Sequence, residues 1–470
     1  MSGRVLRTPL RAHGSSVLVA TLSSAFGVAL LQVTGVLSAV IRADDVTGSS
    51  ATVAVLLVVL AVVFIVIAVY VGAVVTANTF ATIIAGRTRQ IALLRLVGAG
   101  ARGLRRTVAS EGLLVGVVGA VLGALVGTGV AAALAYGAVA ADVMPAFDYS
   151  WAQPVLLLPI VAVALVTWLA SWVGSRRVLA VTPLEAIAGS QERSRDEVAS
   201  RPARRALAIG LAVAGLALLG LALVLGLVTP LAVLIGMVGG VLSFTGVVLG
   251  ADLVIPPALR LSGRLLGGSA PTRLAAENAV RHPERSARAT IGLVIGVTLV
   301  TMFGVAIASF RQLIHAAQQA EPEVYQGIDQ MLDVVTIVFS VLVGFSALIA
   351  AVGLVNNLSL SVLQRTRELG LLRALGFSAG QLRRMILAES AQLVFTAVVI
   401  GLVLGAFYGW VGAQSLLGSI NGSPGVVLPG VPWLVVGVIV LAAALLTAIA
   451  SWAPARRAVR VSPIAALAVE

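Results

Sequence analysis

Ten long apolar segments dominate this chain and limit the folds that it can adopt. Each approaches or exceeds the ~20 residues that an α-helix needs to cross the hydrocarbon core of a bilayer. Of the 470 residues, 59% are hydrophobic and only 11% are charged, whereas a soluble domain carries about 25% charged residues. The sequence therefore predicts an all-α polytopic membrane protein with ten transmembrane helices, at residues 16–40, 52–80, 108–140, 153–175, 206–228, 231–255, 289–310, 334–360, 386–415 and 432–453.

The arginines between these segments predict the orientation. All 32 basic residues are arginine. If successive segments cross the membrane in opposite directions, 30 of these arginines lie on the same side of the membrane as the N-terminus. Only Arg42 and Arg311 fall on the other side. Because cytoplasmic loops are enriched in basic residues, we expect both termini in the cytoplasm. Residues 206–228 and 231–255 are so close that we expect a tight helical hairpin.

Missing residue types exclude several chemistries. The chain has no cysteine, so disulfides and thiolate metal sites are excluded. It has no lysine, and a standard P-loop needs a lysine to reach the phosphates of ATP. The three histidines are far apart, and no serine, histidine and acid form a recognisable catalytic motif. We therefore expect no enzyme and no metal or cofactor bound by this chain; if ATP drives it, a partner subunit holds ATP and Mg²⁺.

An internal repeat divides the chain. Residues 87–111 align without gaps with residues 365–389, with 12 identities in 25 positions. Residues 167–187 similarly match residues 447–467. Four segments belong to each repeat and two link them, so both repeats enter the membrane in the same direction, as in parallel repeats related by an axis along the membrane normal. We expect a first repeat at 1–190, a linker with two helices at 191–270 and a second repeat at 271–470.

The duplicated segments lie between the second and third span of each repeat. On a helical wheel their arginines fall on one side and their leucines on the other. Such a helix could lie on anionic lipid headgroups or dock a cytoplasmic partner. Residue-by-residue duplication exceeds what a lipid-surface helix requires, which favours docking.

The pattern RTRELGLLRALGFSAGQLRRMILAES at 365–390, with its copy at 87–112, resembles the signature of the FtsX-like (MacB-type) ABC transporter permeases. The resemblance implies a permease in the cytoplasmic membrane of a bacterium that works with a separate cytoplasmic ATP-binding subunit, in two copies. It further implies that 86–100 and 364–378 act as coupling helices on that subunit. The expected coupling residues are Arg87, Arg89, Leu93, Leu94, Arg95 and Gly98, and Arg365, Arg367, Leu371, Leu372, Arg373 and Gly376.

One departure from the family concerns the outer loops. Family members usually carry a large extracellular domain between the first two helices of a repeat, but here only residues 41–51 and 311–333 occupy those places. Short loops favour a substrate handled within or near the bilayer. The leading hypothesis is export or extraction of a hydrophobic or amphipathic compound, such as a drug, an antimicrobial peptide or a lipid, by transmission of force across the membrane. The alternatives are a signalling or scaffold protein driven by an ATPase, and an ion-coupled secondary transporter.

Polar residues in or near the spans are candidate sites, because polar groups are costly in a bilayer. Glu111 and Glu389 occupy equivalent positions in the two repeats, near the predicted cytoplasmic interface. Asn78 and Asn356 are likewise equivalent to each other and lie late in the second span of each repeat. We expect the glutamates to pair with nearby arginines or to link the coupling helix to the bundle. The asparagines are expected to pack between helices or to contact substrate. Glycines at spacings of three or four, at 116–127 and 401–409, predict close helix contacts.

Overall fold

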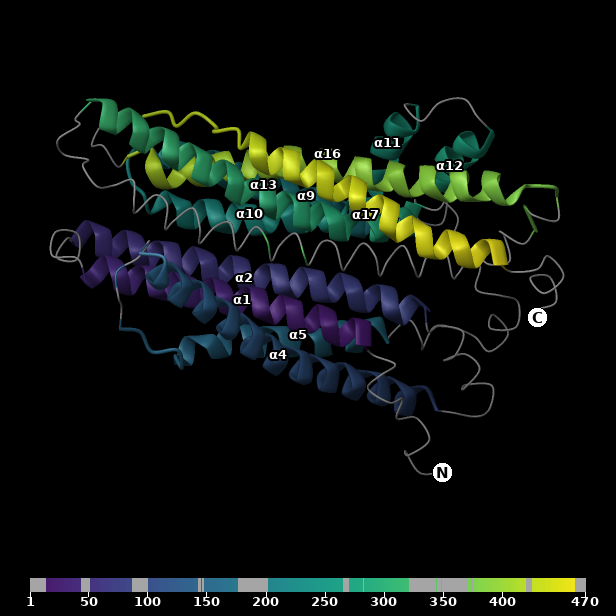
Figure 1. Cartoon of the computed structure of the whole chain (residues 1–470), viewed down its shortest axis with the longest axis horizontal. Helices are drawn as coiled ribbons and strands as arrows, with labels where there is room; N and C mark the ends of the chain where they lie inside the picture. Colours follow the sequence, from purple (N-terminus) through teal and green to yellow (C-terminus); the bar gives the residue numbers. More distant parts are fainter. Residues whose placement is uncertain are drawn as a thin grey trace.

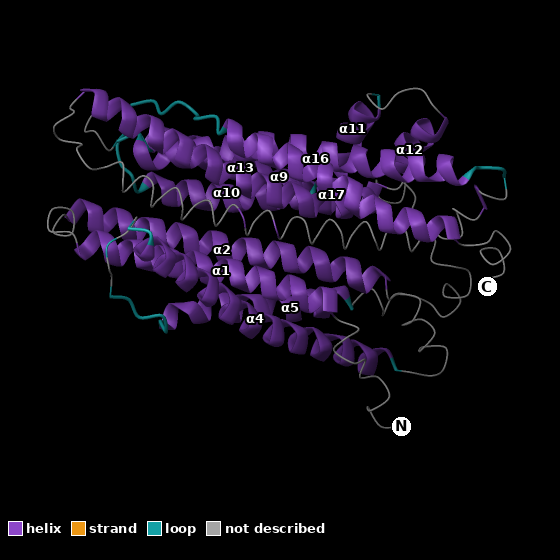
Figure 2. Ribbon diagram, in the orientation of Figure 1, coloured by secondary structure: helices purple, strands orange, loops and turns teal. Residues whose placement is uncertain are grey.

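The chain forms a long bundle of helices (Figures 1 and 2). The computed structural model describes residues 14–43, 51–86, 100–142, 145, 148–175, 202–264, 270–281, 283–320, 344, 348, 371–372, 375–419 and 425–460. Within these ranges every regular element is helical. They are α1 (Gly14–Ala43), α2 (Ala51–Gly86), α4 (Ala101–Ala140), the 3₁₀ turn η2 (Pro154–Leu156), α5 (Leu157–Gly174), α9 (Pro202–Leu225), α10 (Ala232–Leu249), α11 (Ala251–Gly263), α12 (Ala270–Arg281), α13 (Pro283–Ala320), α16 (Ala379–Leu417) and α17 (Trp433–Arg460).

Eight of the described helices are long and apolar enough to cross a membrane, so the chain is a polytopic membrane protein. They match eight predicted spans. The predicted span 334–360 lies outside the described residues. The predicted span 432–453 falls on α17, which contains the apolar stretch Trp433–Leu445. The number of ten crossings therefore stays a prediction.

The helices form two groups in Figure 1. One group contains α1, α2, α4 and α5, in which α4 packs along α1 and α5 packs against both α2 and α4. The other contains α13, α16 and α17, in which α16 packs along α13 and against α17. The linker helices α9 and α10 pack together as the predicted hairpin and lie against α16. α1 begins and α17 ends at the same end of the bundle, near α11 and α12 (Figure 1).

Several helix boundaries differ from the predicted spans, and three of them have a clear local cause. α4 and α16 begin at Ala101 and Ala379, seven residues before the apolar segments 108–140 and 386–415, because the arginine-rich stretch before each segment is also helical. The sixth span ends at Leu249 rather than residue 255, where Gly250 leaves helical geometry and α11 starts in a new direction. Pro256 and Pro257 lie inside α11 and lack the amides that would bond to the preceding turn.

The predicted glycine contacts are confirmed, and they recur in the two groups. A Cβ added to Gly127 of α4 would lie 2.6 Å from the Ala25 carbonyl oxygen of α1. A Cβ added to Gly405 of α16 would lie 2.6 Å from the Thr298 carbonyl oxygen of α13. In both places the absence of a side chain lets two helix backbones touch, as small residues do in membrane bundles. Gly116 instead faces α5.

A buried glutamine secures a connecting loop in each group. In the first, Gln32 of α1 donates through Nε2 to the Trp151 carbonyl (2.8 Å) and accepts from the Tyr149 hydroxyl (2.9 Å). Burial raises the pKa of Tyr149 above its ordinary value of 10.0, so the phenol keeps the proton that it donates. In the second, Gln414 of α16 donates to the Gly425 carbonyl (2.9 Å) and accepts from the Val427 amide (2.6 Å).

Candidate functional site

The predicted coupling segments fall largely outside the described residues. This applies to the whole set from the first repeat and to half of the second: Arg87, Arg89, Leu93, Leu94, Arg95, Gly98, Arg365, Arg367 and Arg373, together with Asn356. The structure describes Leu371, Leu372 and Gly376 of the second copy. The geometry of this candidate site therefore comes from the second repeat.

Gly376 ends one helical turn, as its position in the sequence suggests. Its φ of +97° lies in the left-handed region that favours glycine. The Phe377 amide donates to the Leu372 carbonyl (3.0 Å), the bond that closes a helix in a Schellman motif. Ser378 and Gln381 then form a reciprocal capping box that starts α16. The chain thus makes a tight, hydrogen-bonded turn directly before the long helix.

This turn presents apolar and basic side chains together. Leu371 is 52% exposed and Leu375 is 73% exposed, and Arg383 and Arg384 at the start of α16 are also exposed. We refer to these four residues as the coupling edge. Exposed leucines beside arginines are typical of a surface that a protein partner covers, since apolar anchors and arginine are enriched in interfaces.

Leu372 has a different environment from Leu371 and Leu375. It is partly buried and packs against a cluster formed by α12 and the start of α16, which includes Ala275, Leu382 and Met385. Its side chain therefore fastens the turn to the bundle, and its predicted role in coupling stays a prediction.

Glu389 is buried inside the bundle, with 8% of its surface exposed, and takes part in an interaction there. It lies ten residues into α16, so it is less accessible than the predicted interfacial position implies. One turn further on, Gln392 donates to the Leu259 carbonyl of α11 (2.7 Å), and Thr396 shares a hydrogen bond with Ser262 (2.9 Å). Polar contacts thus connect α16 to α11 beside Glu389.

The equivalent region of the first repeat is built differently. The Arg105 guanidinium lies over the Trp172 ring of α5, with Cζ 4.1 Å from the ring centroid. Arg105 is partly buried, whereas its repeat mate Arg383 is exposed. Glu111 and Asn78 are both partly buried and both take part in interactions. Arg105 therefore anchors the start of α4 to α5, a role that the sequence did not suggest.

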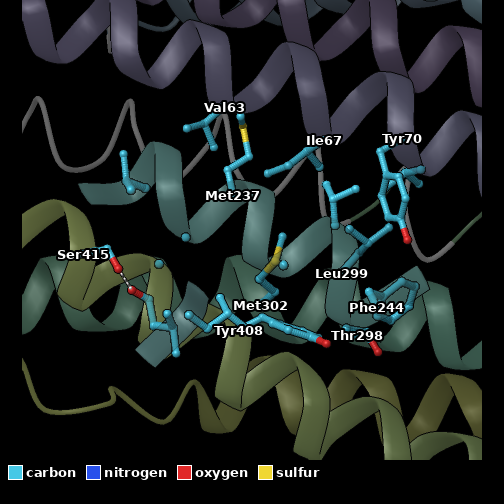
Figure 3. Close-up of a pocket in the computed structure, with 18 of the residues that line it drawn as sticks. Val63, Ile67, Tyr70, Met237, Phe244, Thr298, Leu299, Met302, Tyr408 and Ser415 are labelled. Carbon is cyan, nitrogen blue, oxygen red and sulfur yellow. Dashed lines mark hydrogen bonds between the residues drawn. The ribbon is translucent and has the colours of Figure 1, made fainter. Parts of the chain in front are cut away.

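A cavity of about 140 Å³ lies where the two groups of helices meet the linker (Figure 3). Its described lining is almost entirely apolar and comes from α2, α9, α10, α13 and α16. Phe244 of α10 stands edge-on to Tyr70 of α2 and to Tyr408 of α16, with ring centroids 6.4 and 6.0 Å apart. These three rings form a continuous contact from the first repeat through the linker to the second.

Hydroxyl pairs reinforce the same junction. Tyr70 lies 2.9 Å from the Thr245 hydroxyl and Tyr408 lies 2.9 Å from the Ser243 hydroxyl. Thr245 and Ser243 already donate to carbonyls of α10, and a hydroxyl has one proton. α10 thus shares a hydrogen bond with each repeat.

The FtsX-like permease C-terminal family matches residues 62–183 and 340–463. These two segments cover just over half of the chain, and each extends from the second span of a repeat to beyond its last. The chain belongs to the FtsX-like permease family.

Curated relatives agree with this assignment. The chain is 31% identical over 148 residues to the uncharacterized ABC transporter permease YknZ of Bacillus subtilis, which is 32% of this chain and 35% of YknZ. It is 32% identical over 148 residues to the macrolide export ATP-binding/permease protein MacB of Rhodopirellula baltica, which is 32% of this chain and 20% of MacB. The matched region thus covers about a third or less of the length of these relatives. Together with the family match, they identify the chain as a multi-pass ABC permease of the cell membrane.

The hydropathy pattern of this FtsX-like permease did not predict the cavity. One signal was available. Tyr70 and Tyr408 lie well inside the apolar spans 52–80 and 386–415, whereas tyrosines of membrane proteins concentrate at the two interfaces. A tyrosine in the middle of a span needs a hydrogen-bond partner there, which indicates a contact between helices.

Proposed function

We propose that this FtsX-like permease is the membrane subunit of an ABC transporter that exports or extracts a hydrophobic or amphipathic compound. A separate cytoplasmic ATP-binding subunit, in two copies, supplies the energy by binding and hydrolysing ATP with Mg²⁺. The observation that carries the proposal is the coupling edge, where exposed Leu371 and Leu375 stand beside exposed arginines at the start of α16.

The proposal includes a topology. Ten spans place both termini and both coupling segments in the cytoplasm, and the repeats at 1–190 and 271–470 each dock one ATPase. The arginine distribution supports this orientation. The grouping of α1, α2, α4 and α5 apart from α13, α16 and α17 is consistent with two repeats joined by a linker.

The path of force follows from the continuity of α16. This helix runs without interruption from Ala379, next to the coupling edge, to Leu417. A helix of this length spans more than 50 Å at 1.5 Å per residue. A push on the coupling edge therefore moves the helix as a rod, and the hydrogen bonds of Gln392 and Thr396 carry that movement to α11.

The first experiment is co-purification with the ABC ATPase encoded beside this chain. We expect a complex that hydrolyses ATP, and we expect the Arg95→Glu/Arg373→Glu variant to lose at least tenfold in affinity, since reversed charges face the ATPase at both sites. The matched control is Arg42→Glu/Arg260→Glu, which reverses two exposed arginines outside the coupling segments. Equal weakening by both variants, or no complex with a folded and monodisperse permease, would contradict the proposal. A complex whose ATPase responds to a ligand without any flux would identify a sensor instead.

A further inference from the structure

The short helix α11 is fixed to the bundle by one of its faces. Ile255, Leu259 and Ser262 lie on this inner face and are buried. The first two belong to the main apolar core, and Ser262 shares a hydrogen bond with Thr396 of α16 (2.9 Å). The Leu259 carbonyl also accepts from Gln392 of α16 (2.7 Å). The position of α11 is therefore tied to that of α16.

The opposite face of α11 combines aliphatic and basic side chains. Val254 is 42% exposed and Leu261 is 65% exposed, and Pro257, Arg260 and Arg264 are exposed too. At about 100° per residue, these five positions fall within one arc of roughly 120°, with the aliphatic residues along one flank and the arginines along the other. We refer to them as the outer face of α11. Such a separation is typical of an amphipathic helix at a membrane surface.

The end of α10 indicates the depth at which α11 lies. The Arg204 guanidinium of α9 donates to the carbonyl of Leu249, the last residue of α10 (3.0 Å). Farther along α9, Leu207 and Ile209 are exposed, as side chains that face lipid tails are. Arginines near the ends of spans extend toward the headgroups, so Leu249 lies at the boundary between tails and headgroups. α11 begins two residues later and lies at the outer edge of the second group of helices (Figure 1), where lipid is its neighbour.

The charge of the outer face selects one class of lipid. Arg260 and Arg264 are four residues apart, which is about one helical turn, so both guanidinium groups reach the same region. Guanidinium groups bind phosphate oxygens through paired hydrogen bonds. A zwitterionic lipid brings a positive group of its own beside the phosphate, whereas an anionic lipid does not. The outer face therefore fits anionic phospholipid, with Val254 and Leu261 directed among the acyl chains.

We propose that α11 is an interfacial anchor that binds anionic phospholipid through Arg260 and Arg264. A lipid on the outer face holds α11 in place, and the hydrogen bond of Gln392 to the Leu259 carbonyl makes α11 a fixed support beside α16. The predicted topology places this lipid in the cytoplasmic leaflet. The site is independent of the proposed function, because lipid binding requires neither the ATPase nor transport.

The first test measures how deep the outer face lies in a bilayer. The chain has no cysteine, so Leu261→Cys gives a single position for a nitroxide label in the full chain. The labelled protein is placed in vesicles of phosphatidylcholine and phosphatidylglycerol. Oxygen relaxes labels among lipid tails, and a water-soluble nickel chelate relaxes labels in water. We expect oxygen to act more strongly at residue 261, as at Leu216→Cys in the exposed side of α9, while Leu375→Cys of the coupling edge should respond to nickel.

The second test measures the dependence on headgroup charge. Phosphatidylglycerol or phosphatidylcholine is titrated into the detergent-solubilised full chain without ATPase, and bound lipids are counted by native mass spectrometry. We expect Arg260→Gln/Arg264→Gln to weaken phosphatidylglycerol binding about five- to twentyfold and to leave phosphatidylcholine binding unchanged. Arg102→Gln/Arg106→Gln is the matched control, because it also removes two exposed arginines four residues apart. It should change the affinity little, and soluble glycerol 3-phosphate should not displace the lipid.

Several results would overturn the proposal. A label at residue 261 that responds to the nickel chelate as residue 375 does would place the outer face in water. If adding the ATPase then shielded that label, the outer face would be a protein-docking surface instead. Equal affinities for the two lipids, or equal losses in the two arginine variants, would show that α11 does not select anionic lipid. Displacement by glycerol 3-phosphate would identify a site for soluble phosphate esters.

Discussion

The two groups of helices share one contact and differ in what surrounds it. In the first, Gly127 lets α4 touch α1 at Ala25, and small side chains such as Ser24 and Ala29 fill the surroundings. In the second, Gly405 lets α16 touch α13 at Thr298 and Met302. Both of these larger residues also line the cavity. The comparison indicates that the backbone contact is what the repeat preserves, while the side chains of α13 adapt one copy to the junction.

The largest effect is expected from closing this shared contact. Gly127→Ala and Gly405→Ala each place a Cβ 2.6 Å from a carbonyl oxygen, so each should destabilise the protein by about 1–3 kcal/mol through overpacking. Thermal unfolding in detergent measures the loss. The controls Gly129→Ala and Gly412→Ala add a Cβ that meets nothing within 4 Å, and their Tm should stay unchanged or rise slightly, since alanine favours helices. If only one of the two repeats is sensitive, the shared contact is not equivalent in both.

A comparable effect is expected at the glutamines that secure the connecting loops. Gln414→Leu leaves the buried Val427 amide and the Gly425 carbonyl without their partner, at a cost of about 1–3 kcal/mol. Gln32→Leu removes the partner of the Trp151 carbonyl and the Tyr149 hydroxyl. Amide hydrogen exchange should rise at Val427 in the first variant and stay low there in the second. The exposed Gln319→Leu serves as control, and unchanged exchange at Val427 in Gln414→Leu would refute the role of Gln414.

The smallest effect sharpens the contrast between Arg105 and its repeat mate Arg383. Arg105→Ala loses the contact with the Trp172 ring, so we expect a stability loss of about 0.5–2 kcal/mol. Arg383→Ala removes an exposed side chain, so its Tm should stay within error of the wild type while binding of the ATPase weakens. Matching Tm values for the two variants would mean that the ring contact contributes nothing measurable.

Hydropathy predicted where the spans lie because burial in lipid demands long apolar helices. It could not predict where α4 and α16 begin, because Arg102 and Arg383 belong to helical turns that are not apolar. The break at Gly250 was missed for a related reason, since the residues on both sides are apolar and only the backbone changes direction. Helix type is thus readable from composition, and helix ends depend on local geometry.

The candidate sites divide in the same way. The turn at Gly376 can be predicted from the local sequence, because a left-handed turn selects glycine. The outward direction of Leu371 and the inward direction of Leu372 depend on α12, which lies about a hundred residues earlier in the chain. The cavity depends on five helices from three parts of the sequence. No periodicity within one segment contains that information.

The junction of Tyr70, Phe244 and Tyr408 has a consequence for the energy source. The described residues of this junction are rings, hydroxyls and aliphatic groups without formal charge. A membrane voltage does work only on charge that moves, about 2.3 kcal/mol per elementary charge per 100 mV. Sliding of one repeat against the other at this junction therefore moves no charge through the field. A membrane voltage therefore does not favour one position of these residues over another, and the bias has to enter from the aqueous ends of the helices.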